Sequence, residues 1–142
     1  MLDTEPALIE QYVRSGQVRI VYRHLLQLGE RSVLLSEYSE CAHDQGRFWE
    51  LRYALYARYN QLFSDTLAVA EEAAASVGVN REAARACYDS GAYRAQVAAD
   101  FAAATAAGIR SRPVFVVEER TMIGAQPLTI FQELIDQALE RR

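Results

Sequence analysis

The residues with the most evident chemistry are two cysteines, two histidines and a proline that opens an apolar run. Cys41 and Cys87 are the only cysteines in the chain, and no CxxC pair occurs in its 142 residues. Thiol–disulfide exchange needs a thiolate of lowered pKa, typically at the start of a helix, with a second cysteine close by. Both cysteines instead lie within helical patterns, which is typical of small buried side chains.

The histidines indicate no metal site. No cluster of cysteine or acidic side chains with metal-ligand spacing surrounds either of them, so we expect no zinc, no other metal and no cofactor. His24 follows an alternating segment, and a lone histidine with no paired nucleophile is more often structural than catalytic. A group of aromatic side chains is expected to pack helices together rather than to line a ligand site: Phe48, Trp49, Tyr53, Tyr56 and Phe63.

Composition and charge exclude several classes of partner. With 51% hydrophobic and 24% charged residues, the chain suits one compact domain, residues 1–142. The net charge is −4 and the arginines are scattered, except at Arg141–Arg142, so no basic stripe favours nucleic acid. No segment approaches the roughly 18 apolar residues of a membrane span, and the acidic N-terminal stretch is unlike a secretory signal.

The stretch GIRSRPVFVV, residues 108–117, places a proline at the mouth of a β-branched run. Because proline cannot donate a hydrogen bond to a sheet, we expect a strand that begins at Pro113. A trans proline opening an edge strand is one interpretation. A cis Arg112–Pro113 bond is the other, and it would turn the preceding peptide group outward, where an extended partner could bind it.

Periodicity predicts the order of the elements. A helix capped by Asp3 or Thr4 and ended by Gly16 precedes a strand over Gln17 to Arg23. Four or five short helices follow, in an inserted block over about residues 30–107. A strand over Pro113 to Val117, a turn at Glu118–Glu119, a partner strand over Arg120 to Ile123 and a helix opened by Pro127 complete the chain.

This order resembles the DsbA-like branch of the thioredoxin fold, an α/β fold in which a helical block is inserted into a βαβ-ββα core. Five segments in family order carry the resemblance, which covers essentially the whole chain: PALIEQYVRSGQVRIVYRHL at 6–25, ECAHDQGRFWE at 40–50, ACYDSGAYRAQV at 86–97, GIRSRPVFVV at 108–117 and IGAQPLTIFQELI at 123–135.

The resemblance implies roles for four residues. The proline matching Pro113 is cis in the family, and the backbone of the preceding residue, here Arg112, pairs with the substrate peptide. Arg112 is bulkier than the residue usual at that position and favours an acidic partner. Some family members join cysteines matching Cys41 and Cys87 in a disulfide that staples two helices of the inserted block, and the family is extracytoplasmic. The compartment of this chain stays open.

The largest departure from the family is at the N-terminus. A first strand and a CxxC precede the segment that matches residues 6–25, whereas only Met1 to Glu5 stand there in this sequence. We therefore expect a truncated thiol–disulfide oxidoreductase with no catalytic residues of its own, inactive as it stands. The alternatives are a non-catalytic thioredoxin-fold module for binding or dimerisation, and a protein resembling the glutathione-linked isomerases, which use a residue at the same missing site.

The missing first strand also predicts a homodimer. In the family it lies between the strands matching Gln17–Arg23 and Pro113–Val117, so its absence leaves two edges rich in Val and Ile. Unpaired strand edges are templates for association. We expect Val18, Ile20, Val114 and Val116, or the helices beside them, at the interface.

Overall fold

The computed structural model describes residues 4–141, which form two compact units. The helical unit runs from Arg23 to Ala104. The hairpin unit consists of the chain up to Tyr22 and from Thr105 onward. The inserted helical block predicted from the sequence corresponds closely to the helical unit. That the whole chain is one domain stays a prediction.

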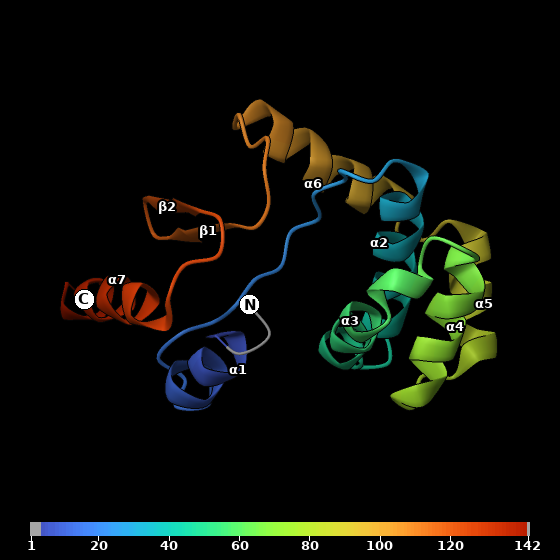
Figure 1. The fold of residues 1–142 in the computed structure, drawn as a ribbon, viewed down its shortest axis with the longest axis horizontal. Coiled ribbons are helices and arrows are strands. Elements are labelled where there is room, and N and C mark those ends of the chain that lie inside the picture. Colours follow the sequence, from blue (N-terminus) through green and yellow to red (C-terminus); the bar gives the residue numbers. More distant parts are fainter. Residues whose placement is uncertain (1–3, 142) are drawn as a thin grey trace. The chain divides into compact units, whose positions relative to one another are not determined.

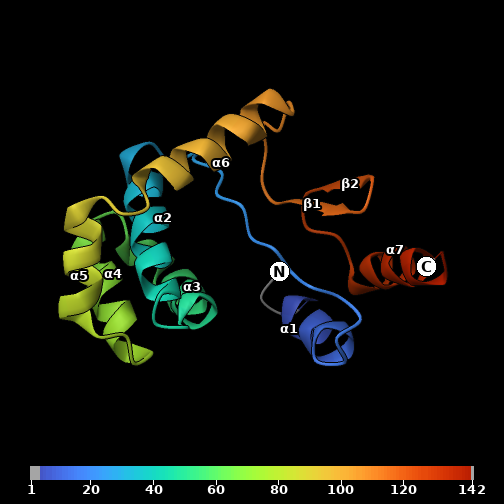
Figure 2. The ribbon, with the colours of Figure 1, turned by 180° about the vertical axis from the view of Figure 1, so that it is seen from behind.

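The helical unit is built from short helices that follow one another directly (Figures 1 and 2). Their bounds are α2 Glu30–His43, α3 Phe48–Ala57, the 3₁₀ turn η2 Tyr59–Gln61, α4 Thr66–Ser76, α5 Arg81–Ser90 and α6 Arg94–Ala106. Asp65 and Asn80 begin α4 and α5 because their side chains accept hydrogen bonds from the backbone N–H groups of Ala68 and Ala83. The helices predicted over residues 30–107 are therefore confirmed.

Small side chains allow the helices of this unit to pack closely. The buried interior contains Tyr38 and Leu51 with no exposed surface, and between them lie several fully buried alanines: Ala42, Ala70, Ala73 and Ala84. Alanine loses no side-chain entropy on burial and lets helix backbones approach. The alanine-rich sequence thus gives a dense interior in spite of its weak amphipathic pattern.

The hairpin unit contains the only strands among the described residues. α1 (Thr4–Leu8) continues into the π-helical turn η1 (Ile9–Val13), and after the helical unit come β1 (Val114–Val117), β2 (Arg120–Ile123) and α7 (Leu128–Glu140). β1 and β2 pair antiparallel, with Val114 opposite Ile123. Glu118 has φ of 53°, the left-handed conformation that tight two-residue hairpin turns use.

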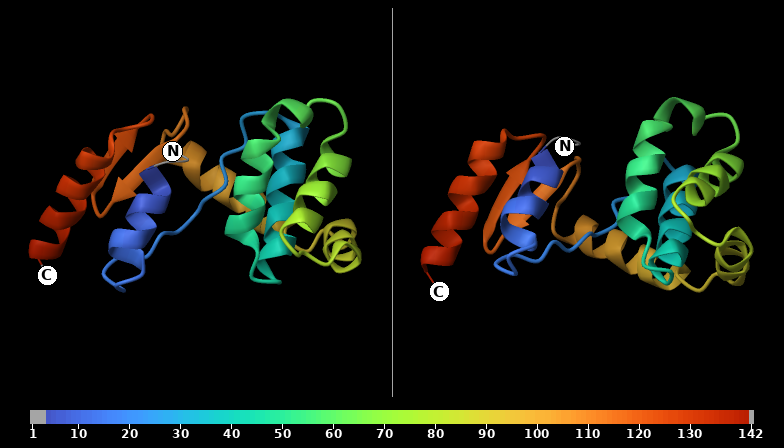
Figure 3. Two further views of the ribbon diagram at one scale, coloured as in Figure 1. Left: turned by 60° about the horizontal axis from the view of Figure 1, so that its bottom comes forward. Right: turned by 90° about the horizontal axis from the view of Figure 1, so that it is seen from below.

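α7 joins the hairpin to the N-terminal helix (Figure 3). The rings of Phe115 on β1 and Phe131 on α7 meet edge to face, with centroids 4.8 Å apart. The Tyr12 hydroxyl donates to an Asp136 carboxylate oxygen at 2.8 Å, and burial together with this bond raises the pKa of Tyr12. The face of α7 that packs therefore carries its buried apolar residues, Phe131, Ile135 and Ala138.

The predicted strand over Gln17 to Arg23 is wrong. The chain there is extended but joins no ladder, and the N–H groups of Gln17 and Val18 both donate to the Tyr12 carbonyl at 3.1 Å. The exposure still alternates, with Val18 and Ile20 half-buried and Arg19 and Val21 exposed. A strand also needs a hydrogen-bonded neighbour, and within residues 4–141 only β1 and β2 pair. Asp3, one of the two predicted caps, lies outside the described residues.

Candidate functional site

The loop before β1 presents an unengaged peptide group. α6 ends near Gly108, and the chain reaches β1 through Arg112 and Pro113, whose peptide bond is cis. The Pro113 carbonyl accepts a hydrogen bond from the Gly124 N–H at 2.8 Å, which ties the loop to the far end of the hairpin. Within the described chain, neither the N–H nor the C=O of Arg112 makes a backbone hydrogen bond. Arg112 is exposed, and the next residue, Pro113, is held to the hairpin by its hydrogen bond with Gly124.

The hairpin next to this loop has one packed face and one bare face. Phe115 and Met122, which are opposite each other in the register, face inward, and Met122 is 8% exposed. On the other side Val116 and Ile123 are 60% and 63% exposed. β1 pairs with β2 along one edge, and no described strand covers its other edge. The arrangement can therefore offer backbone hydrogen bonds and an apolar surface to an added chain.

A disulfide joins the two helices that carry the cysteines. Cys41 on α2 and Cys87 on α5 are bonded, with Cα atoms 5.8 Å apart, as the family resemblance implied. Both cysteines of the sequence are thus engaged, and no free thiol remains. Cys41 is 2% exposed and lies in the interior of the helical unit, whereas Cys87 is half-buried.

An acidic residue lies beside this disulfide. The Asp44 Oδ2 atom, just after α2, is 4.0 Å from the Cys87 sulfur, and Oδ1 accepts a hydrogen bond from the Tyr93 hydroxyl. That hydrogen bond, with burial and the Asp44 charge, raises the pKa of Tyr93 to about 12. The group lies within the helical unit and links α2 to the start of α6.

His24 is structural in this arrangement. Its side chain is 3% exposed, and its Nε2 atom lies 2.6 Å from Oε1 of Glu40 on α2. Its backbone N–H donates to Asp100 on α6 at 3.2 Å, and Asp100 also pairs with Arg23. These bonds hold the start of the helical unit against two of its helices. This agrees with the structural interpretation of His24 rather than with a site role.

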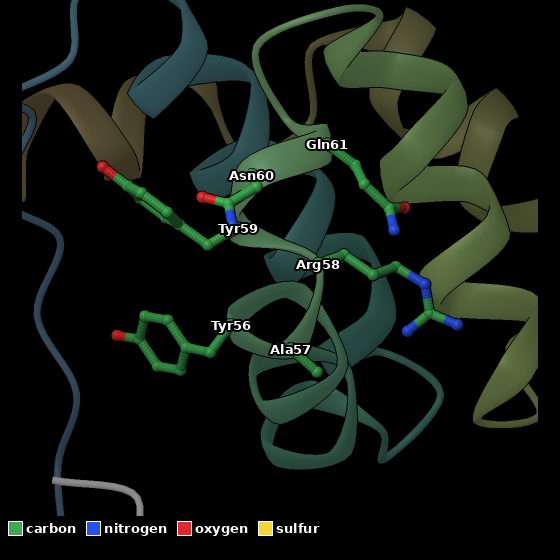
Figure 4. Close-up of a pocket in the computed structure, with 6 residues that line it drawn as sticks. All are labelled: Tyr56, Ala57, Arg58, Tyr59, Asn60 and Gln61. Atoms are coloured by element: carbon green, nitrogen blue, oxygen red, sulfur yellow. The ribbon is translucent and has the colours of Figure 1, made fainter.

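The aromatic residues divide between interior and surface. Phe48 is buried, whereas Tyr56 and Phe63 are each 44% exposed. Phe63 instead packs on the surface against the ring of Tyr59 and under the Arg31 guanidinium. Figure 4 shows a shallow pocket at the turn after α3, with Tyr56 and Tyr59 extending to one side and Arg58 and Gln61 to the other.

The sequence predicted the loop at Arg112 and Pro113 and the pairing of the cysteines, but it did not predict two side-chain contacts of acidic residues in the helical unit. The bonds Glu40–His24 and Asp44–Tyr93 join residues that are 16 and 49 positions apart. Nothing in the local pattern of an acidic residue on a helix indicates which distant side chain it will bind. Only the paired placement of two helices brings these groups together.

Comparison with known proteins identifies the fold. A family model described as thioredoxin matches residues 2–137. A crystal structure of a thioredoxin-like oxidoreductase from Silicibacter pomeroyi DSS-3 superposes with a TM-score of 0.78 at 24% identity, covering 98% of this chain and 77% of that chain. No curated protein matches the chain.

The fold is thioredoxin-like, with a helical block between its N-terminal helix and its C-terminal ββα segment. Within the described residues, no helix is both long enough and apolar enough to cross a membrane. Because the family model spans almost all of the sequence, the match is not confined to one motif. The chain belongs to the thioredoxin family, in agreement with the DsbA-like character of its sequence.

Proposed function

We propose that residues 1–142 supply the peptide-binding part of a DsbA-like thiol–disulfide oxidoreductase and do not themselves catalyse disulfide exchange in protein substrates. An extended segment of a partner protein binds through its backbone to the peptide group of Arg112, next to Pro113. The observation that carries this proposal is that the Arg112 N–H and C=O form no backbone hydrogen bond among residues 4–141. An exposed, unpaired backbone of this kind is what strand addition uses.

The surroundings of Arg112 support the position of the binding site. The Gly124–Pro113 hydrogen bond fixes the residue that follows, so Arg112 is held at the end of an ordered hairpin. The exposed Val116 and Ile123 lie on the same hairpin and provide apolar surface for alternate side chains of an added segment. Backbone pairing would supply affinity, and these side chains would supply part of the specificity.

The charge at Arg112 indicates the chemistry of the partner. Within the described chain the Arg112 guanidinium makes no ion pair, and its side chain is exposed. An acidic residue on the bound segment would therefore meet an uncompensated positive charge. Exposed ion pairs contribute modestly to affinity but strongly to orientation and association rate. We infer an extended, acidic partner segment.

The experiment compares two synthetic peptides, one of alternating Val and Glu and one of alternating Val and Gln. We expect tighter binding of the Glu peptide in isothermal titration. Arg112→Glu should weaken that binding by about 3- to 10-fold and leave the Gln peptide nearly unaffected, because reversal of one exposed charge changes the free energy by about 1 kcal/mol.

Arg120→Glu on β2 makes the same change of charge elsewhere on the hairpin and serves as the matched control. Equal losses for the two variants, or equal affinity of the wild type for the two peptides, would contradict a site at Arg112.

The absence of dithiol exchange has its own test. The chain has no CxxC, and both of its cysteines form one disulfide between α2 and α5. Insulin reduction by the purified chain should therefore equal that of a Cys41→Ser/Cys87→Ser control. A rate well above the control would show that the pair itself is a working dithiol and would overturn this part of the proposal.

A second candidate function, self-association, is favoured by the bare face of the hairpin. Val116 and Ile123 are largely exposed, and β1 has an open edge within the described structure. A second copy could pair with that edge in a symmetric contact. Sedimentation equilibrium should then show a dimer at micromolar concentration that Val116→Lys converts to monomer. A monomeric wild type would exclude this alternative and leave the peptide proposal intact.

A further inference from the structure

The two sulfurs of the disulfide differ in how a thiol can reach them. Cys41 is 2% exposed and belongs to the interior of the helical unit with Tyr38 and Leu51. Cys87, late on α5, is half-buried. Thiol–disulfide exchange requires in-line approach of a thiolate to one sulfur, with departure of the other. Of the two cysteines, Cys87 is the more exposed residue.

The carboxylate beside Cys87 has a fixed position. Asp44 follows the last turn of α2, where its N–H donates to the Glu40 carbonyl at 3.2 Å. The Tyr93 hydroxyl donates a hydrogen bond to Oδ1. The other carboxylate oxygen, Oδ2, lies 4.0 Å from the Cys87 sulfur. Among the described residues, no arginine or histidine forms an ion pair with Asp44. The Asp44 carboxylate therefore lies beside the Cys87 sulfur with no cationic partner in the described part of the chain.

We infer that Cys87 is a thiol-exchange site and that Asp44 selects which small-molecule thiols react there, against anionic thiols and in favour of cationic ones. The inference concerns the helical unit and does not depend on peptide binding at Arg112. Asp44 forms no bond to the reacting sulfur and takes no part in proton transfer. It acts only through its charge.

The reaction balances with two equivalents of an external thiol. A thiolate RS⁻ forms a bond to the Cys87 sulfur, and the Cys41–Cys87 bond breaks with its electron pair on the Cys41 sulfur, which takes up a proton. A second RS⁻ attacks the added sulfur, releasing RSSR and the Cys87 thiolate. The protein disulfide is reduced by two electrons, and two thiols are oxidised to one disulfide. Formation of the Cys41 thiolate in apolar surroundings slows the first step for every thiol.

The selectivity follows from the separation of the charges. At about 4 Å in water, two unit charges interact strongly enough to change a rate by about 5-fold, and added salt reduces the effect. Asp44 repels the attacking thiolate of every reagent; further carboxylates on the reagent add to that repulsion and an ammonium group offsets it, so the ratio of the two rates reports the Asp44 charge. The ratio is therefore the quantity to measure.

The test measures reduction of the folded, full-length chain by glutathione, whose reactive thiolate also carries carboxylates, and by cysteamine, whose reactive thiolate carries an ammonium group. Loss of the disulfide is measured at low ionic strength by alkylation and mass spectrometry. Each rate is divided by the thiolate concentration of the reagent. We expect Asp44→Asn to accelerate glutathione by about 5-fold and to change the cysteamine rate little, so that the ratio of the two rates changes by about 5-fold. The mixed disulfide trapped by acid should be on Cys87, with Cys41 free to be alkylated.

Two variants distinguish an effect of the Asp44 charge from an effect of loosened structure around the disulfide. Glu72→Gln on α4 removes one exposed negative charge with no contact at the disulfide, and it should leave the ratio unchanged. Tyr93→Phe removes the hydrogen bond to Asp44 but keeps the charge, and it should preserve the preference for cysteamine. Equal changes with both thiols in Asp44→Asn, a ratio in Tyr93→Phe that matches Asp44→Asn, or a mixed disulfide on Cys41 would each overturn the inference.

Discussion

The helical unit and the hairpin unit differ in two respects: how completely their backbone groups are hydrogen-bonded within the unit, and how completely their apolar surface is buried. In the helical unit the regular backbone hydrogen bonds are formed within helices. Its interior holds side chains with no exposed surface, such as Tyr38 and Leu51. A disulfide adds a covalent link between α2 and α5. The hairpin unit has two strands, open edges and exposed Val116 and Ile123.

This difference underlies the placement of the proposed binding site. An isolated two-stranded hairpin is marginal in water unless further strands or helices cover it, and α7 covers one face only. The helical unit needs no such addition. The proposed peptide site lies accordingly on the hairpin unit, which is the part with exposed strand edges. The predictions below test that division, from the largest expected effect to the smallest.

The largest effect is expected from removal of the disulfide. Cys41→Ser/Cys87→Ser should destabilise the helical unit by about 4 kcal/mol, because a loop of this length gains that much entropy in the unfolded chain. Hydrogen exchange of α2 and α5 amides should become much faster, with α7 unchanged. Equal acceleration in α7 would show that the two units unfold together and would break the comparison.

Phe131→Ala should affect the other unit. Phe131 is 2% exposed and meets Phe115 edge to face, so its truncation should cost about 3 kcal/mol and release the hairpin from α7. Exchange of β1 and β2 amides should approach that of an unfolded chain while α4 keeps its protection. Retained protection in β1 would show that the hairpin does not depend on α7.

The exposed face of the hairpin should tolerate change. Ile123→Thr keeps a β-branched side chain at a position that is 63% exposed, so the unfolding free energy of the monomer should change by no more than about 0.5 kcal/mol. Urea unfolding at low protein concentration measures this. A loss well above that size would mean that Ile123 is covered within one chain, and the bare face would not exist.

The last effect is confined to alkaline pH and comes from Tyr93. Its pKa is raised from 10.0 to about 12, so the folded chain holds this proton more tightly than the unfolded chain. The resulting stabilisation is complete below pH 10 and is lost as the pH rises toward 12. Tyr93→Phe should remove this part of the decline in thermal unfolding curves measured between pH 9 and 12. An unchanged decline in the variant would exclude the Asp44 hydrogen bond as its cause.

The sequence predicted those features that depend on local pattern or on a family motif. The helices over residues 30–107, the hairpin from Val114 to Ile123 and the link between the cysteines agree with the structure because capping residues, alternation and motif spacing lie in the sequence itself. The strand at Gln17 to Arg23 failed because alternation predicts a pattern of exposure, whereas a strand also needs a neighbour. The Asp44–Tyr93 contact depends on the packing of distant helices, which no local pattern encodes.

The most direct test of the account measures hydrogen exchange of the full chain with and without the Val–Glu peptide. The account predicts that the Arg112 amide and those of β1 become protected on binding, that amides of α2 and α5 stay as they were, and that Arg112→Glu needs about 3- to 10-fold more peptide for the same protection. Protection that appears in the helical unit, or that is the same in Arg112→Glu, would contradict the assignment of the binding surface to the hairpin unit.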